Sequence, residues 1–146
     1  RRRTVRGLSG GGRIREGGLA DGFCGDDDTG QTSAWFIWGA LGFYPVCPGS
    51  GEYVLGTPYF RHAVLHLEND KDVTIRAPRN NGANRYVQKL KMNGREYRVN
   101  YLNHKDLLKG GRLDFTMAAE PDRHRGTGQE AAPYSFSREG KGTAKR

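Results

Sequence analysis

One run of ten residues constrains the fold more than any other part of this 146-residue chain. The run is "TSAWFIWGAL", residues 32–41, and it is apolar around the whole circumference of a helix. Gly42 suits the left-handed position that ends a helix, and Pro45 and Pro48 prevent the helix from continuing. A helix that is apolar on all sides needs neighbours on all sides. The rest of the chain is too small and too β-rich to supply them, so we predict that a helical part of a longer protein lies upstream.

The second half of the chain has the pattern of β-strands. Apolar and polar residues alternate over residues 62–67, and a second such run at 72–76 follows the turn-forming "ENDK". Two further alternating runs flank Asn93 and Gly94, a pair that tolerates the positive φ angles of a tight hairpin turn. Residues 112–118 alternate as a final strand. We therefore predict an α+β chain in which one buried helix is followed by an antiparallel β-rich unit of about five to seven strands.

Charge divides the chain into a neutral body and two basic ends. The formal net charge is +8. Residues 1–20 hold six arginines against one glutamate, and residues 138–146 hold four basic residues against one glutamate. The body, residues 21–137, has 14 basic and 14 acidic residues. A nucleic-acid groove would place its basic residues among aromatic residues on ordered elements, so we expect no nucleic-acid partner.

These patterns predict four regions. Residues 1–20 form a leader that is disordered or translated in the wrong frame, and residues 138–146 form a disordered basic tail. Residues 21–48 contain a loop and the apolar helix, and residues 49–137 form the antiparallel β-rich region. No run reaches the roughly 20 apolar residues of a membrane span, so we expect no membrane partner. Cys24 and Cys47 are interpreted as two buried thiols, with a disulfide in an oxidising compartment as the alternative.

Three consecutive aspartates, Asp26, Asp27 and Asp28, precede the apolar helix. One explanation is capping, because carboxylates accept hydrogen bonds from the free N–H groups of a first helical turn, although one aspartate would suffice. A second explanation is calcium binding. An EF-hand loop that began at Asp26 would have Gln31 where glycine is needed at position 6 and Ile37 where glutamate is needed at position 12. The sequence therefore does not fit a calcium loop of that type.

The third explanation for the acidic triplet is general-base catalysis. In an extended stretch Asp26 and Asp28 point to the same side, and Asp27 points to the other. Two carboxylates on one side can hold a water molecule between them, and each raises the pKa of the other so that one accepts the proton. An inverting glycoside hydrolase needs such a base opposite its general acid. The spacing alone leaves all three explanations open.

Four aromatic residues lie on or directly after the apolar helix: Trp35, Phe36, Trp38 and Phe43. We interpret them as core residues, because an all-apolar helix is usually buried, with stacking on a sugar ring as the alternative.

The stretch "GFCGDDDTGQTSAWFIWGALGFYPVCPGSGEYVLGTPYF" resembles the C-terminal part of glycoside hydrolase family 92, the calcium-dependent exo-acting α-mannosidases. The likeness continues through "NRYVQKLKMNG", "YLNHKDLLKGG" and "APYSFS", so it covers about residues 21–137. The combination of the acidic loop with "LGFYPVCPG" is specific to this family. It implies an inverting hydrolase that removes terminal α-mannose from N-glycans or mannan.

The resemblance also implies a fold and a set of roles. The family has an N-terminal β-sandwich and an (α/α)6 barrel, so residues 32–41 would be one buried barrel helix and most of the polypeptide would be missing here. The family's pair of base aspartates falls on Asp26 and Asp28. Its catalytic acid is a glutamate far upstream, for which Glu16 is no match, and its Ca2+ ligands also lie largely upstream, so none is assigned. The family's usual setting is secreted or periplasmic.

Two positions depart from the family's pattern, since relatives often have Glu and Asn where this chain has Asp27 and Thr29. We expect both changes to be mild. Residues 1–20 do not resemble the barrel helix expected at that place. The alternative hypothesis is a non-catalytic β-sandwich module that binds a glycan or a partner domain, with the aspartates as a capped acidic turn. As an isolated chain we expect no turnover, because an inverting mechanism needs both an acid and a base.

Overall fold

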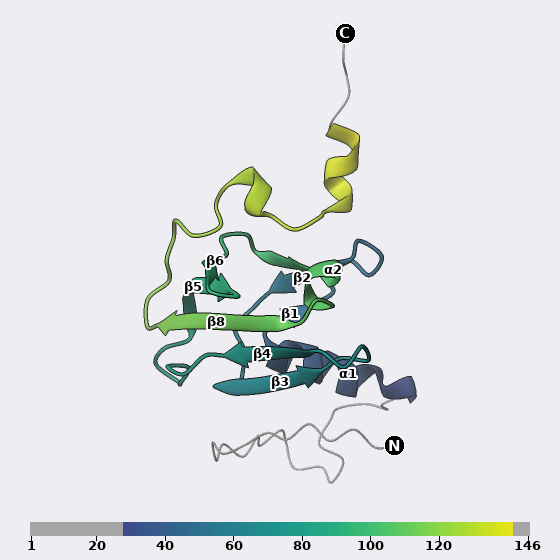
Figure 1. Ribbon diagram of the computed structural model, residues 1–146. Coiled ribbons are helices and arrows are strands. Elements are labelled where there is room, and N and C mark those ends of the chain that lie inside the picture. The colour runs from purple at the N-terminus through teal and green to yellow at the C-terminus, as the bar shows by residue number, and fades with distance from the viewer. Residues whose placement is uncertain (1–27, 142–146) are drawn as a thin grey trace.

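The computed structural model describes residues 28–141, with side chains for residues 29–138. The predicted leader, the last five residues of the basic tail and two of the three aspartates lie outside this range. Within it, one main helix, α1, is followed by two β-sheets and a C-terminal segment with short helical turns (Figure 1). The chain is thus a small α+β unit, as predicted.

Helix α1, Gln31–Leu41, covers the predicted apolar run, and Gly42 ends the helix in the left-handed conformation with φ 88°. The Gly42 N–H donates to the Gly39 carbonyl, which closes the last turn. Only Ala40 and Leu41 of the helix are buried. The Trp35 side chain is 56% exposed, so the described residues do not surround the helix on all sides. The prediction that a small β unit cannot cover this helix is confirmed.

The smaller sheet has the strand order β1-β2-β7, and both of its pairings are antiparallel. Its strands are β1 (Phe43–Tyr44), β2 (Glu52–Leu55) and β7 (Tyr101–Asn103). Only Gly42 separates α1 from β1, so the helix and the sheet are joined without a loop. Gly42 is also crowded, because a Cβ at that position would lie 2.6 Å from the Pro58 nitrogen. The orientation of α1 against the sheet therefore depends on this glycine.

The larger sheet has the strand order β3-β4-β8-β5-β6. Its strands are β3 (His62–His66), β4 (Asp72–Arg76), β8 (Gly111–Ala118), β5 (Tyr86–Met92) and β6 (Arg95–Glu96). The β4–β8 pairing is parallel, so the prediction of an antiparallel unit is wrong at this position. The chain forms three other strands between β4 and β8 and then returns beside β4 in the same direction. The described residues contain eight strands, and the two-residue strands β1 and β6 are too short to show alternation.

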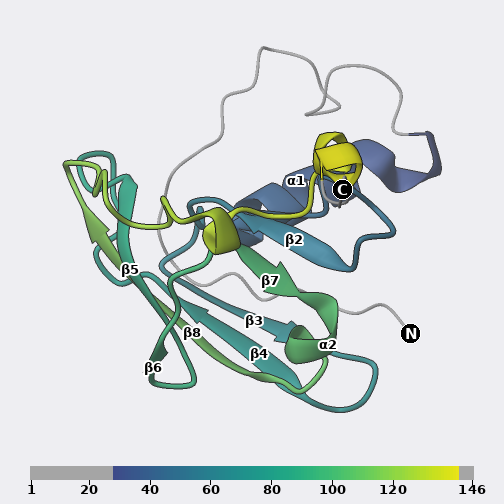
Figure 2. The same cartoon turned by 90° about the horizontal axis from the view of Figure 1, so that it is seen from above.

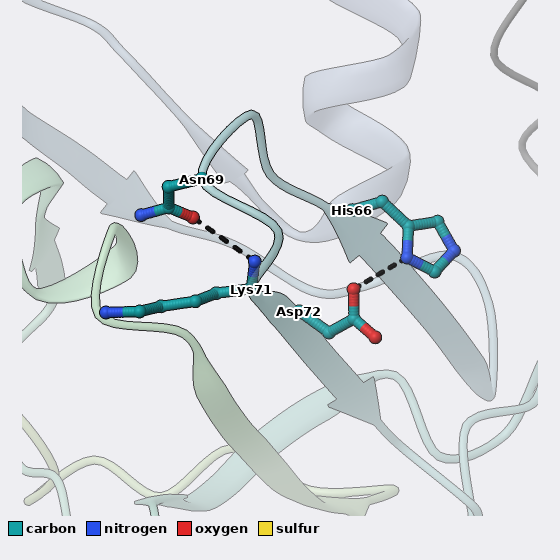
Figure 3. A network of polar contacts seen from close by, with 4 residues as sticks. All are labelled: His66, Asn69, Lys71 and Asp72. Carbon is teal, nitrogen blue, oxygen red and sulfur yellow. Dashed lines mark hydrogen bonds and ion pairs between the residues drawn. The ribbon is translucent and has the colours of Figure 1, made fainter.

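Both predicted hairpins are present. Asn93 and Gly94 join β5 to β6 with φ angles of 52° and 83°, as a type I′ turn requires. The turn between β3 and β4 contains Asp70 at φ 59°. Figure 3 shows two contacts around that turn. The Asn69 Oδ1 accepts the Lys71 backbone N–H at 3.3 Å, and the His66 Nδ1 lies 2.6 Å from the Asp72 Oδ1 across the strand pair.

The hydrophobic core is shared by both sheets and the end of α1. Its buried members are Leu41, Phe43, Val73, Ile75, Ala77, Leu90, Leu102, Leu107, Leu113, Phe115 and Met117. Leu107 comes from the short helix α2, His104–Leu107, which follows β7 directly. No helix in the described range is long and apolar enough to cross a membrane.

The segment after β8 returns past β5 and β6 and then runs along the side of the molecule opposite α1 (Figure 1). It contains the 3-10 turns η2 (Gln129–Ala131) and η3 (Phe136–Lys141). Two hydrogen bonds tie it to the small sheet: the Ala131 carbonyl accepts the Asn100 N–H at 2.8 Å, and Glu52 Oε2 accepts the Tyr134 N–H at 2.6 Å. Figure 2 shows this segment passing close to β2 and β7. The C-terminal segment therefore packs on the β unit.

Candidate active-site loop before the apolar helix

The predicted base residues lie at the N-terminal end of the described range. Asp28 is the first residue of the 3-10 turn η1, Asp28–Gly30, and only its backbone is described. Asp26 lies outside the described residues. The prediction that the two carboxylates share one side of the chain therefore stays a prediction.

The backbone after Asp28 has an unusual conformation. Thr29 (φ 58°, ψ 13°) and Gly30 (φ 77°, ψ 19°) are both left-handed, and α1 begins at the next residue. The N-cap position is Gly30, which has no side chain that could cap the helix. None of the three aspartates is the N-cap residue of α1, and their side chains lie outside the described range, so the capping explanation stays open. Two consecutive left-handed residues turn the chain sharply between the acidic triplet and the helix.

Thr29 is the residue least suited to this turn. A left-handed backbone brings Cβ close to the neighbouring carbonyl oxygen, and a β-branched side chain is an outlier there. Asparagine adopts the same conformation more readily. Thr29 is therefore strained in its backbone, and the expectation that it leaves the paired aspartates intact stays a prediction. Backbone strain of this kind is typical of sites that hold a side chain in a fixed place.

Aromatic contacts hold the C-terminal half of α1 against the β unit. The Trp38 ring stacks on Tyr53 of β2, with the ring centroids 5.1 Å apart and the planes at 23°. Trp38 also contacts Phe43 edge to face at 5.5 Å, and Phe43 is 1% exposed. The interpretation of Phe43 as a core residue is confirmed, and Trp38 is half-buried and packs against the core. Trp35, on the half of α1 nearer the acidic triplet, is mostly exposed among the described residues.

Burial has an electrostatic effect on Tyr53. It raises the pKa of the Tyr53 hydroxyl, which lies 2.8 Å from Nδ1 of His104. Tyr53 therefore stays a neutral packing residue at physiological pH, as its place on a strand predicts.

The described residues offer no metal centre. No group of three or more His, Cys, Asp or Glu side chains lies close enough within this range to hold a metal ion. The acidic triplet lies mostly outside this range, so no ligand is assigned for the Ca2+ that the resemblance implies. Cys47 is half-buried, and Cys24, its possible disulfide partner, lies outside the described residues.

Comparison with known proteins shows that this chain contains part of a glycoside hydrolase catalytic domain. The family model described as glycosyl hydrolase family 92 catalytic domain matches residues 17–119, a range that includes the acidic triplet, α1 and all eight strands. The chain belongs to glycosyl hydrolase family 92.

Solved structures and a curated relative agree with this assignment. A family 92 inverting mannosidase from Bacteroides thetaiotaomicron is 46% identical, with a TM-score of 0.71 over 78% of this chain and 16% of its own. A family 92 α-mannosidase from the same organism is 37% identical, with a TM-score of 0.73 over 77% of this chain and 15% of its own. An uncharacterized secreted glycosidase from Arthroderma benhamiae is 32% identical over 77% of this chain and 15% of its own length. The chain thus spans less than a fifth of the length of these relatives.

Proposed function

We propose that this chain is the C-terminal part of an inverting exo-α-mannosidase and contributes the general-base loop of its active site. The observation that supports this most strongly is the family match across the acidic triplet and α1. The two solved relatives described as mannosidases are 46% and 37% identical to this chain in regions that cover 78% and 77% of it. We propose α-mannosides of N-glycans or mannan as the substrate.

In the proposed mechanism Asp26 and Asp28 hold the attacking water. One carboxylate accepts its proton while the water oxygen attacks the anomeric carbon from the face opposite the leaving group. A carboxylic acid on the other side protonates the glycosidic oxygen, so the bond breaks with inversion. The acid would come from another part of the longer protein, since Glu16 does not match it. The ligands of the Ca2+ that the resemblance implies would come largely from another part of the longer protein, since the described residues contain no group of three or more His, Cys, Asp or Glu side chains that could hold a metal ion.

The fold suits this role because it fixes the loop at one end. The sharp left-handed turn at Thr29 and Gly30 separates the aspartates from the start of α1. At the end of α1, Trp38 and Gly42 hold the helix against the β unit. Catalytic groups must be held to within a fraction of an ångström, and a packed helix is a more rigid support than a free loop. The exposed side of α1 would pack against the rest of the proposed barrel.

We further propose that the longer protein is secreted or periplasmic. The support is the Arthroderma benhamiae relative, which is described as secreted.

A chimera tests the base assignment. Residues 21–138 of this chain would replace the matching segment of the 46%-identical Bacteroides mannosidase, and kcat and KM would be measured on an aryl α-mannoside. Asp26→Asn and Asp28→Asn each remove a charge without changing shape, and loss of a general base lowers kcat by about 10²- to 10⁴-fold. The matched control is Asp70→Asn, the same change at an exposed turn whose φ of 59° asparagine also tolerates.

The outcome separates the two hypotheses. We expect a large loss of kcat in both loop variants and no change in the control. Unchanged kcat in Asp26→Asn and Asp28→Asn, in a chimera that is itself active, would remove the base assignment and favour a non-catalytic β module.

A further inference from the structure

A pocket lies away from the acidic loop. It has a volume of about 210 Å³ and lies between the β5–β6 hairpin and the segment after β8. None of its lining residues belongs to η1 or α1. The lysine, arginine, aspartate and glutamate residues that line it are Lys89, Glu96, Arg98, Asp122 and Arg125.

Arg125 is the residue that defines this pocket. Its Nη1 donates to Oδ1 of Asn100 at 2.9 Å, and its Nη2 donates to the carbonyl oxygens of Tyr97 and Val99, each at 3.4 Å. These acceptors are all neutral. Burial lowers the pKa of the guanidinium, and the nearby charge of Asp122 opposes that change. An arginine remains protonated even so, and its half-buried positive charge forms no ion pair in the described part of the chain.

Asp122 interacts with the Arg125 charge without forming an ion pair with it among the described residues. Its Oδ1 accepts the backbone N–H groups of His124 and Arg125 at 2.9 and 3.3 Å, which fixes the loop that presents Arg125. The carboxylate is therefore a structural group of the turn rather than the ion-pair partner of the guanidinium.

The opposite wall adds further positive charge. Lys89 of β5 is exposed and forms no ion pair among residues 29–138. Glu96 is paired with Arg98 at 2.9 Å, so these two charges cancel. Arg98 first, and Lys89 and Lys91 after it, hold the pKa of Glu96 below its ordinary value. The carboxylate therefore responds to a positive local field, and Lys89 and Arg125 are the cations left without a paired anion.

We propose that this pocket binds a small oxyanion, a phosphate or carboxylate group that is free or attached to a sugar. A half-buried guanidinium fixed by neutral acceptors is oriented in advance for such a group, and charge-assisted hydrogen bonds are the strongest that it can form. The pocket volume of about 210 Å³ accommodates such an anion with one attached ring, and Lys89 is one of the lining residues. The proposed anion site does not depend on the proposed mannosidase activity, because anion binding is measured without hydrolysis of a substrate.

Titration calorimetry on the full chain at low ionic strength tests this site. The probes are inorganic phosphate, mannose 6-phosphate and unphosphorylated mannose. We expect both phosphates to bind at one site and mannose to show no binding there. Equal affinity for the two phosphates assigns the site to a free anion, and tighter binding of the sugar phosphate assigns it to an anion on a glycan. Added sodium chloride weakens either, because screening reduces the attraction.

Three variants locate the binding to this pocket. Lys89→Gln removes an exposed charge and is expected to weaken phosphate about two- to fivefold, the usual range for an exposed ion pair. Arg125→Gln removes the half-buried charge and is expected to weaken phosphate binding about tenfold or more. Lys105→Gln is the matched control, since Lys105 is also exposed but does not line the pocket.

Circular dichroism of each variant reports whether the fold is kept, and Lys89→Gln decides the test if Arg125→Gln unfolds. Phosphate affinity that is the same in Lys89→Gln and Lys105→Gln would overturn the proposal. Binding of mannose as tight as that of mannose 6-phosphate would overturn it as well.

Discussion

Gly42 gives the most decisive test of how the helix is joined to the β unit. Its φ of 88° costs an alanine roughly 1–2 kcal/mol, because Cβ then crowds the adjacent carbonyl. The added Cβ would also lie 2.6 Å from the nitrogen and 2.8 Å from the Cα of Pro58, and both are backbone atoms that cannot rotate away. Overpacking of this kind typically costs about 1–3 kcal/mol. We therefore expect Gly42→Ala to destabilise the chain by about 2–5 kcal/mol.

Gly39 supplies the matched control three residues away. It lies inside α1, and an added Cβ there meets nothing within 4 Å in the described structure. Alanine restricts the unfolded chain and favours helix, so Gly39→Ala should stabilise by about 0.5–1 kcal/mol. Urea unfolding followed by tryptophan fluorescence measures both, because the Trp38 ring is stacked on Tyr53 only in the folded state.

The two glycine variants should thus change the urea midpoint in opposite directions. A Gly42→Ala variant that is as stable as the parent, or more stable than Gly39→Ala, would refute the argument that this glycine sets the position of α1.

Three further predictions follow from single features of the structure. Thr29→Asn should stabilise the chain by about 0.5–1 kcal/mol, because asparagine adopts the left-handed conformation at lower cost, and a lower urea midpoint would contradict this. Burial raises the pKa of Tyr97, and interactions with Asp106, Tyr101 and Glu52 raise it further. The neutral Tyr97 hydroxyl therefore contributes its full stability below pH 10.0, and this contribution is lost as the pH rises through the raised pKa of the folded state. Urea midpoints at neutral and alkaline pH should therefore fall less for Tyr97→Phe than for the parent, and an equal fall would refute this. The purified chain alone should not hydrolyse an aryl α-mannoside, and measurable release of the aryl group would show that the acid and base are both present in it.

Local patterns were enough to predict the helix, its end and both hairpins. The apolar run fixes α1, and Gly42 and the Asn93-Gly94 pair fix their turns because few residues tolerate positive φ. The parallel pairing of β4 with β8 was missed, since it joins segments separated by three intervening strands and no local signal reports it. Contacts of this range are decided by packing of the whole sheet rather than by periodicity.

The two candidate sites also differ in how far the sequence alone predicts them. The acidic loop is visible in the sequence as a run of charge before an apolar helix. The Arg125 pocket is not visible in the sequence, because it brings residues 88–90 and 96–98 together with residues 122 and 124–126. The cluster "DRHRG" at residues 122–126 was the available signal, but charge runs are usually solvated and gave no reason to pair it with β5. The strain at Thr29 was likewise hidden, since only the backbone angles reveal it.

The central claim is that this chain is one segment of a longer family 92 hydrolase, with the base loop in this segment and the acid elsewhere. Sequencing the coding DNA upstream of Arg1 and translating all three frames tests it most directly. We predict an adjoining stretch that encodes a helical barrel with a glutamate-bearing loop. A genuine start codon near Arg1, with no such stretch in any frame, would contradict the claim and leave a β-rich binding module with one uncovered helix.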